Sequence, residues 1–366
     1  MIATAAGQAP PFCPNPSCPF HRSGGDCWRY RRHGFFPRQQ SPHRVQRFQC
    51  GHCRRTFSTQ TFLTTYWLKC PTLLPQIFHQ LLACSGYRQI ARQYRVSPTT
   101  ILTHAARLGR HCLLFHEQLR PKGPFIESLV IDGFESFEFS QYHPTAFHVA
   151  VGSPSHFFHG FTDSELRRRG RMTERQKARR LWLESQFGRP HPRSIEHEVT
   201  ALLGTLAPLP QRLTLYSDDH QAYPRALAQL PHLDVTHEIT SSREPRTSSN
   251  PLFPVNLLDL LIRHSCANHK RETIAFSKRR QSAAERLWLL LVWRNYLKCF
   301  SEKKRDATPA MRLGVLERAL SVADVLRRRI FPGRVPLPFR WRDYYRRGET
   351  TRRIPNGATH RLRYAF

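Results

Sequence analysis

The 366-residue sequence predicts a mixed α/β (α+β) protein made of four consecutive segments. Three observations carry this prediction. Two cysteine pairs lie near the N-terminus, a run of apolar residues at helical spacing follows them, and strand and helix patterns alternate through the middle of the chain. The length suits two or three domains rather than one. We place the segments at residues 1–66, 67–122, 123–300 and 301–366.

The charge balance narrows the function before any motif is considered. The chain carries 57 Lys plus Arg against 26 Asp plus Glu, a formal net charge of +31. Folding does not need this excess, and a polyanionic partner would relieve the self-repulsion. Nucleic acid is the expected partner, with ribosomal RNA and anionic lipid as alternatives. The longest purely apolar run, residues 287–293, is too short to span a bilayer, so we expect no membrane partner. The first residues show no basic region followed by an apolar one, so we expect no signal peptide, and the uneven spread of the cysteines indicates a reducing, cytoplasmic setting.

The first segment, residues 1–66, is predicted to be a zinc ribbon. Cys13 and Cys18 form one pair, and Cys50 and Cys53 form a second pair with C-x-x-C spacing. Two such knuckles joined by a strand hairpin bring four sulfur atoms to one tetrahedral ion. Free cysteines in a small core are a poor alternative, because so short and polar a segment has little core to offer. Three further side chains are alternative ligands: His21, Cys27 and His52.

The second segment, residues 67–122, carries a helix-turn-helix pattern. Apolar residues recur at helical spacing from Leu74 to Tyr94, and Ser97 followed by Pro98 is a typical start for the next helix. The second helix of such a pair presents its side chains to a DNA major groove. The alternative is a helical hairpin used only for packing. The predicted DNA contacts are Ser97, Thr99, Thr100, Thr103, His104 and Arg107.

The third segment, residues 123–300, alternates in the order β-β-β-α-β-α-β-α. Three antiparallel strands followed by alternating helices and strands is the order of the ribonuclease-H-like fold. A basic stretch at 167–180 separates the third strand from the first helix. The strands are expected at 127–139, 146–153, 156–166, 212–219 and 234–240, and the helices near 194–206, at 223–230 and from about residue 254.

Three acidic residues of this segment are expected to converge. In the ribonuclease-H-like fold one acid lies on the central strand, a second ends the fourth strand, and a third lies on the helix after the fifth strand. Here these are Asp132, Asp218 and Asp259. Strand alternation turns Asp219 to the opposite face from Asp218, so Asp219 is the fallback ligand. Glu285 is the alternative third acid, although its helix is strongly apolar.

The chain resembles the DDE transposases of bacterial insertion sequences, of the type with an N-terminal zinc ribbon and helix-turn-helix. The resemblance rests on the two cysteine knuckles, on "VIDGF" and "LYSDDHQAY", and on "RETIAFSK" at residues 271–278, which is similar to an R-x-T-x-x-F-S-K stretch of that family. It implies phosphoryl transfer on DNA with magnesium or manganese held by the three acids. Independently, two such ions about 4 Å apart at a scissile phosphate demand carboxylate ligands. The family usually has Glu at the third position, where this chain has Asp259.

The resemblance also implies a location and partners. We expect a nucleoid-associated bacterial protein that binds double-stranded DNA, both element ends and target, as a homo-oligomer. The alternatives are a zinc-ribbon DNA-binding regulator with an inactive ribonuclease-H-like domain, and a nuclease without strand transfer. In residues 339–366 Arg alternates with Trp, Tyr and Phe, which suits either base stacking or packing on a neighbouring subunit. The basic residues expected to follow the phosphates are Arg263, Lys270, Arg271 and Lys278.

Overall fold

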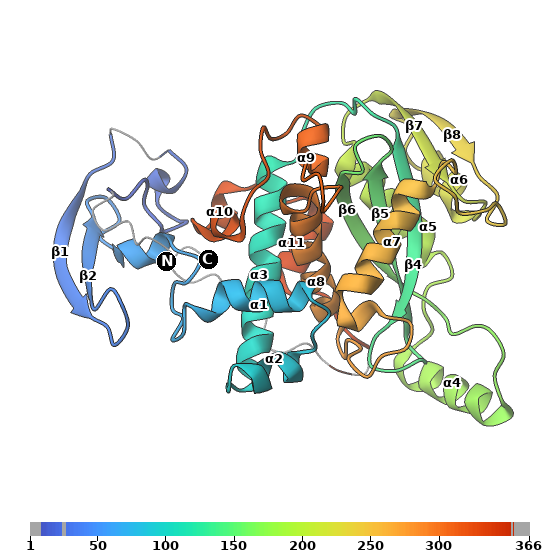
Figure 1. The fold of residues 1–366 in the computed structure, drawn as a ribbon, viewed down its shortest axis with the longest axis horizontal. Coiled ribbons are helices and arrows are strands. Elements are labelled where there is room, and N and C mark those ends of the chain that lie inside the picture. Colours follow the sequence, from blue (N-terminus) through green and yellow to red (C-terminus); the bar gives the residue numbers. More distant parts are fainter. Residues whose placement is uncertain (1–8, 24–26, 353, 355–366) are drawn as a thin grey trace.

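The computed structural model describes residues 9–23, 27–352 and 354. Those residues form a mixed α+β protein with two separate sheets, a small one of three strands and a larger one of five. Figure 1 shows the small sheet at one end of the molecule and the larger sheet toward the other, with helices between them. In this part of the chain, no helix has both the length and the apolar composition that a membrane crossing requires.

The small sheet belongs to the N-terminal segment. Its neighbouring strands are antiparallel, which lets a short chain form a sheet through tight connections. The core beneath it is small and largely aromatic, with Trp28, Phe48 and Phe57 packed beside the cysteines. The strands are β1 (Tyr30–Pro37), β2 (Arg44–Cys50) and β3 (Thr56–Ser58).

Three helices follow the small sheet. The last of them starts as predicted, because the Ser97 hydroxyl accepts the backbone N–H of Thr99 and Pro98 is the first helical residue. That helix has 22 residues, so its C-terminal part extends well beyond the helix-turn-helix pattern. The helices are α1 (Leu73–Leu82), α2 (Tyr87–Gln93) and α3 (Pro98–Leu119).

The extension of α3 packs against α8 (Arg280–Val292) from the third segment. The two helices approach closely at Gly109, where an added Cβ would lie 2.3 Å from the carbonyl oxygen of Glu285. Buried apolar residues of α1, α2 and α3 belong to the same hydrophobic cluster as those of the larger sheet. The helical segment and the sheet therefore share one core.

The larger sheet has the strand order β6-β5-β4-β7-β8. Within it β4 pairs antiparallel with β5, and β5 with β6, whereas β7 runs parallel to β4 and β8 parallel to β7. The central strand is thus β4, the first of the five along the chain. The strands are β4 (Leu129–Phe137), β5 (Pro144–Gly152), β6 (Phe158–Glu165), β7 (Gln211–Ser217) and β8 (Leu233–Ile239).

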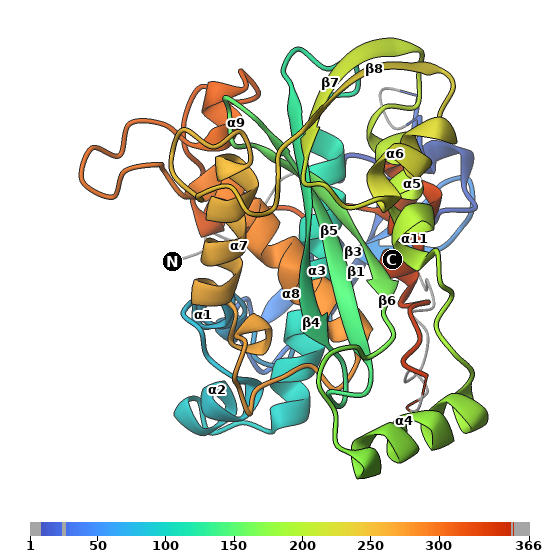
Figure 2. The same cartoon turned by 90° about the vertical axis from the view of Figure 1, so that its right-hand side faces the viewer.

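Helices cover both faces of this sheet. The helix α7 (Phe253–Ser265) packs on β4 and β5, and α5 (Ser194–Leu206) packs on β5 and β6 from the opposite side, as Figure 2 shows. Because both faces are covered, the side chains of β5 are buried almost throughout instead of alternating. A short helix, α6 (Ala222–Ala228), joins β7 to β8.

The basic stretch at 167–180 leads into a helix that the sequence analysis did not predict. The helix α4 (Glu174–Phe187) begins with a capping box, in which Thr173 and Gln176 each bond the backbone of the other. It extends away from the body of the protein (Figures 1 and 2). Leu183 is its one buried residue, so it has no apolar stripe for a periodicity search to detect.

The C-terminal segment places part of the basic aromatic stretch in the core. Trp341 is fully buried against the sheet, where its indole N–H donates to the carbonyl oxygen of Phe161 at 3.2 Å. Tyr344 is buried beside it, and residues 355–366 of the stretch lie outside the described residues. The helices of this segment are α9 (Pro309–Arg312), α10 (Val322–Leu326) and α11 (Phe339–Arg346).

The same segment fastens the small-sheet domain to the rest of the protein. The backbone N–H of Arg329 donates to the carbonyl oxygen of Phe62 at 2.9 Å, and its guanidinium donates to that of Thr61 at 3.2 Å. The rings of Phe12 and Phe331 pack edge to face with centroids 5.1 Å apart. These contacts hold the N-terminal domain against the chain that follows α10.

Candidate functional site

The parallel pairing of β4 with β7 brings two aspartates to the same level of the larger sheet. Val130 pairs with Tyr216, and Asp132 and Asp218 each follow two residues later. Residues two apart on a strand share a face, and adjacent strands lie about 4.8 Å apart. The two carboxylates therefore meet beside the carboxyl end of β7. Asp219 is one residue out of step, and it accepts hydrogen bonds from the backbone and hydroxyl of Ser242 at 3.4 Å.

The third aspartate reaches the same place from α7, which packs across β4. Burial raises the pKa of Asp132 to about 7, and the negative charges of Asp218 and Asp259 contribute to that rise. A hydrogen bond of 2.7 Å from the Gly133 backbone N–H opposes it. The structure thus brings the three predicted acids into one electrostatic neighbourhood, in which a half-buried carboxyl resists ionisation because two others are near.

The oxygen atoms of the three carboxylates lie further apart than the ligand atoms of a site that holds one ion. Among the described residues, the only set of three or more His, Cys, Asp or Glu whose ligand atoms all lie within 4.8 Å of one another is the four-cysteine set. Asp259 nevertheless has a buried oxygen, Oδ1, that accepts no hydrogen bond from any described residue. A buried carboxylate oxygen without a partner beside two other acids is what a divalent cation would satisfy. The donor set therefore fits magnesium or manganese.

The second oxygen of Asp259 corrects one expected DNA contact. Arg263 donates from Nε to Asp259 Oδ2 at 3.1 Å and from Nη1 to the carbonyl oxygen of His269 at 3.1 Å. Arg263 therefore holds Asp259 and the chain after α7 in place, so it is not free to follow a phosphate. The i,i+4 spacing of Asp259 and Arg263 on one helix face explains the pair.

Two further residues face the aspartates, and the sequence analysis did not single out either. Tyr223, buried on α6, has a raised pKa because of its burial and because Asp132 and Asp218 are near. Arg246 is exposed in the connection between β8 and α7, and its positive charge lowers the pKa of Asp132. Within the described chain Arg246 forms no hydrogen bond or ion pair. Tyr223 had a signal, its position just after the strand end, whereas Arg246 lies in a loop without a pattern.

The alternative third acid lies in a different environment. Glu285 on α8 is fully buried and forms an ion pair with Arg347 at 2.9 Å. Gln281, one turn earlier on the same helix, donates to it at 3.2 Å. Both partners therefore hold Glu285 within the core through Oε1, while its Oε2 is buried without a hydrogen bond from a described residue.

The four predicted cysteines come together in the N-terminal domain. The sulfur atoms of Cys13, Cys18, Cys50 and Cys53 all lie within 4.8 Å of one another, so they could hold a metal ion. The Trp28 indole N–H donates to the Cys50 sulfur at 3.3 Å. Burial raises the pKa of the Cys50 thiol, but hydrogen bonds from Trp28 and from the backbone lower it to about 7 overall. The surroundings of Cys50 thus favour its thiolate, which is the form that binds metal, whereas burial raises the pKa of Cys13 and Cys18.

The alternative ligands do not join this group. His21 is buried but uses Nδ1 in a 2.9 Å hydrogen bond with the carbonyl oxygen of Cys13. Cys27 and His52 are exposed, and neither belongs to the set of close ligand atoms.

The predicted DNA contacts on α3 divide into two groups. Ser97, Thr99 and Thr103 are exposed, and Thr100 is half-buried. The structure corrects the expectation of DNA contact for the other two residues. His104 is buried, and the Arg107 side chain is held by backbone carbonyl groups. His104 bonds the carbonyl oxygen of Thr100 at 2.7 Å. The Arg107 guanidinium donates to two carbonyl oxygens of residues 64–66, at 2.9 and 2.8 Å.

The other three basic residues that were expected to contact phosphates have no protein partner among the described residues, unlike Arg263. Lys270, Arg271 and Lys278 are exposed, and none forms a hydrogen bond or ion pair with another described residue. Their charges are therefore available to a polyanion.

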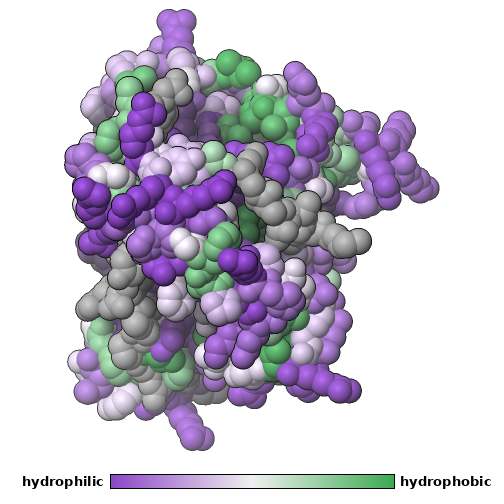
Figure 3. Space-filling view, turned by 90° about the vertical axis from the view of Figure 1, so that its left-hand side faces the viewer, coloured by the Kyte–Doolittle hydropathy of each residue, from purple (hydrophilic) through white to green (hydrophobic). Residues whose placement is uncertain are grey.

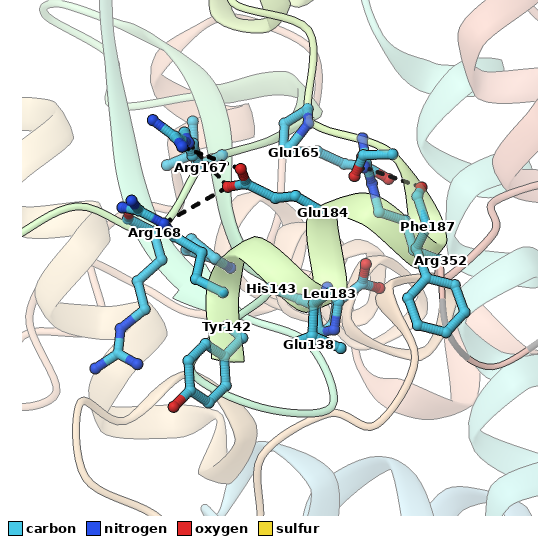
Figure 4. A pocket seen from close by; sticks show the side chains of 15 residues that line it. Glu138, Tyr142, His143, Glu165, Arg167, Arg168, Leu183, Glu184, Phe187 and Arg352 are labelled. Carbon is cyan, nitrogen blue, oxygen red and sulfur yellow. Dashed lines mark hydrogen bonds and ion pairs between the residues drawn. The ribbon is translucent and has the colours of Figure 1, made fainter. Parts of the chain in front are cut away.

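A polar cavity near α4 is separate from the aspartates. It has a volume of about 30 Å³, which suits water rather than a nucleotide. Figure 4 shows the cavity, with Arg167 paired to Glu184 at 2.8 Å and with Arg352 at its edge. Its lining includes Glu138, which directly follows β4, but neither Asp132 nor Asp218.

A buried charge network next to this cavity is structural. Asp163 on β6 is fully buried, forms an ion pair with Arg280 at 3.1 Å and accepts a hydrogen bond from Arg340 at 2.9 Å. Tyr344 also donates to Asp163. These bonds attach α8 and α11 to the edge strand of the sheet, and the sequence alone gave no sign of them.

Comparisons with known proteins add little to this geometry. No family model matches the chain, and no curated protein matches it. Among solved structures, it is similar to a chain in the cryo-EM structure of a simian T-cell lymphotropic virus intasome in complex with the PP2A regulatory subunit B56 gamma. The identity is 14%, the match covers 68% of this chain and 75% of that chain, and the TM-score is 0.28. So low a score supports no conclusion about fold or function.

Proposed function

We propose that this protein is a DDE-type transposase, which binds the ends of a mobile DNA element and catalyses metal-dependent strand cleavage and transfer. The observation that carries the proposal is the meeting of Asp132, Asp218 and Asp259 from two strands and a helix. The chain has a formal net charge of +31 and few acidic residues, so the presence of three of them close together needs an explanation. A cation beside a bound polyanion is such an explanation.

The topology of the larger sheet supports a ribonuclease-H-like fold. Three antiparallel strands are followed by two parallel ones, and the first strand lies at the centre. This is the order in which that fold places one acid on the central strand, one at the end of its parallel neighbour and one on a later helix. Asp132 on β4, Asp218 directly after β7 and Asp259 on α7 support the proposal that these three acids correspond to that set.

The surrounding residues hold two of the three acids in place. The Gly133 N–H orients Asp132, and Arg263 fixes one oxygen of Asp259 so that the other remains for a cation. Magnesium or manganese bound by the three acids would stabilise the attacking and leaving oxygens of a phosphodiester. Tyr223 closes the site from the core side. Arg246 is placed to offset phosphate charge as DNA approaches.

The N-terminal half supplies the proposed DNA-recognition parts. Four cysteine sulfurs within 4.8 Å of one another, three of them on buried residues, suit a closed, structural zinc ion. The exposed hydroxyls at the start of α3 would contact element ends, and the free cations after α7 would contact the backbone of DNA. A homo-oligomer assembled on DNA in the bacterial nucleoid follows from the transposase proposal.

A DNA-binding regulator with an inactive domain is the second candidate. Two observations favour it: the ligand atoms of the three acids do not all lie within 4.8 Å of one another, and an ion pair occupies one oxygen of Asp259. A nuclease without strand transfer would use the same three acids, so only its products distinguish it.

A cleavage assay separates these candidates. The substrate is duplex DNA from the regions that flank the gene, incubated with the purified protein and magnesium or manganese. We expect strand cleavage that Asp132→Ala, Asp218→Ala and Asp259→Ala each abolish, whereas Asp219→Ala retains it. Binding without cleavage by the unaltered protein would favour the regulator, and cleavage without joining to a target would favour the nuclease. Full activity of Asp259→Ala would refute the assignment of the third acid.

A further inference from the structure

A larger cavity lies on the small-sheet domain, away from the aspartates. Its volume is about 360 Å³, within the range of about 300–1,000 Å³ that is usual for small-ligand sites. The walls come from all three strands of the small sheet and from the segment that leads to α1. The lining combines aromatic rings, arginines and polar side chains, including Phe36, Arg38, Arg47, Gln60, Tyr66 and Trp67.

Trp67 is held at this cavity in an unusual way. Its side chain is 78% exposed, and its backbone has a φ of +61°, a conformation that bulky residues rarely adopt. The preceding carbonyl group, that of Tyr66, is fixed by Arg107 at 2.8 Å. Backbone strain of this kind persists where the surrounding structure imposes it, and it is frequent at ligand sites. The indole ring lies edge to face with that of Tyr66, with centroids 6.1 Å apart, and most of its surface is open to solvent.

The electrostatics of the cavity favour an anion. The guanidinium groups of Arg38 and Arg47 form no hydrogen bond or ion pair with other residues in the described ranges, and no Asp or Glu lines the cavity. Residues 27–116 contain no acidic residue at all. Figure 3 looks onto this end of the molecule, where long hydrophilic side chains surround smaller apolar patches.

We propose that this cavity binds one unpaired nucleobase of DNA, with Trp67 stacked on the base and Arg38 and Arg47 contacting the flanking phosphates. An aromatic platform beside arginines is the combination by which proteins hold single-stranded nucleic acid. Gln60 adds an amide that can both donate to and accept from a base edge. A base inside a duplex cannot enter, because it must first leave the stack. The ligand is therefore an overhang or a frayed end.

This inference rests on the proposed function in one respect, namely that the nucleic acid bound is DNA. Cleaved or frayed element ends would offer such a base close to the duplex that α3 contacts. The cavity would then hold the end in register while the duplex is bound.

The test uses the full-length protein and three labelled DNAs in a fluorescence anisotropy titration. One is a blunt duplex, one has a three-thymidine overhang, and one has the same overhang with abasic residues. We expect the thymidine overhang to bind about tenfold more tightly than the abasic one, the effect of stacking one base on an aromatic ring. Trp67→Ala should remove that preference and Trp67→Phe should keep most of it. The matched control is Phe35→Ala, which removes an exposed ring of the same sheet that does not line the cavity.

Each outcome decides between the two proposals. Duplex binding with no preference for the thymidine overhang would overturn the nucleobase site and leave the proposed function standing. Equal losses in Trp67→Ala and Phe35→Ala would also overturn it, because the cavity would then have no special role. Absence of binding to all three DNAs would refute the proposed function together with the inference drawn from it.

Discussion

Replacing Asp132 by Asn should stabilise the folded protein at alkaline pH while removing its proposed activity. Burial and the charges of Asp218 and Asp259 raise the pKa of Asp132 from its ordinary value of 3.8 to about 7. Each tenfold change in proton affinity is worth about 1.4 kcal/mol, so the ionised carboxylate destabilises the fold by at most about 4 kcal/mol above pH 7. Asp132 is only half-buried, and solvent screening reduces the expected gain to about 2–3 kcal/mol.

The gain should depend on pH in a defined direction. The unfolded carboxyl loses its proton near pH 4 and the folded one near pH 7, so the destabilisation grows between these values and is constant above them. Asn is neutral in both states, and its carbonyl oxygen can still accept the Gly133 N–H. The advantage of Asp132→Asn at pH 5 should therefore be less than half of its value at pH 8.

Urea denaturation followed by far-UV circular dichroism at both pH values measures this effect. Asp219→Asn is the matched control, because that neighbouring acid lies outside the cluster and should change the free energy of unfolding by less than about 0.5 kcal/mol. Magnesium should raise the stability of the unaltered protein at pH 8 and leave Asp132→Asn unchanged. An Asp132→Asn variant that is less stable than the unaltered protein at pH 8, or whose advantage does not shrink on acidification, would refute the reasoning.

Three further predictions concern the frame around the site. The double variant Cys50→Ser and Cys53→Ser should lose bound zinc in a metal analysis, whereas Cys70→Ser should keep it, and zinc retained by the double variant would disprove the assignment. Arg107→Ala should lower the free energy of unfolding by about 1–3 kcal/mol, because two carbonyl groups lose their donor; a neutral result would mean that solvent replaces the bonds. Gly109→Ala should destabilise by about 1–3 kcal/mol in the same denaturation experiment, because a Cβ there would collide with the backbone of α8. Unchanged stability of that variant would show that α3 and α8 can separate without loss.

The order of the elements could be predicted because the physical causes are local. Strand alternation, capping residues and cysteine spacing act over a few residues, and they marked the five strands, the start of α3 and the four cysteines. The alternation of side chains along a strand also indicated Asp218 and not Asp219 as the ligand. The parallel register of β7 with β4 explains this, because it aligns Asp218 with Asp132. The helix α4 was missed because it buries almost nothing and so leaves no apolar period.

Side-chain partners across the fold could not be predicted, because they depend on which surfaces meet. A basic residue on α3 suggested DNA, yet Arg107 lies on the face that meets the chain before α1. The same applies to Arg263, whose carboxylate partner is one helical turn away. The aromatic residues near the C-terminus suggested base stacking or packing on a neighbouring subunit, whereas Trp341 fills the core beside β6. Charge and aromaticity state what a side chain can do, and only the fold decides which neighbour it meets.

The central claim is that Asp132, Asp218 and Asp259 form one cation site, and a manganese titration followed by electron paramagnetic resonance tests it most directly. The zinc-loaded full-length protein is compared at pH 7.5 with Asp218→Asn, Asp259→Asn and the controls Asp219→Asn and Glu285→Gln. We predict that the unaltered protein and both controls bind manganese, and that either substitution within the three acids weakens binding at least about tenfold, as the loss of a charged ligand from a shared site should. Manganese affinity that is unchanged in Asp218→Asn and Asp259→Asn, or lost in Glu285→Gln alone, would contradict the account.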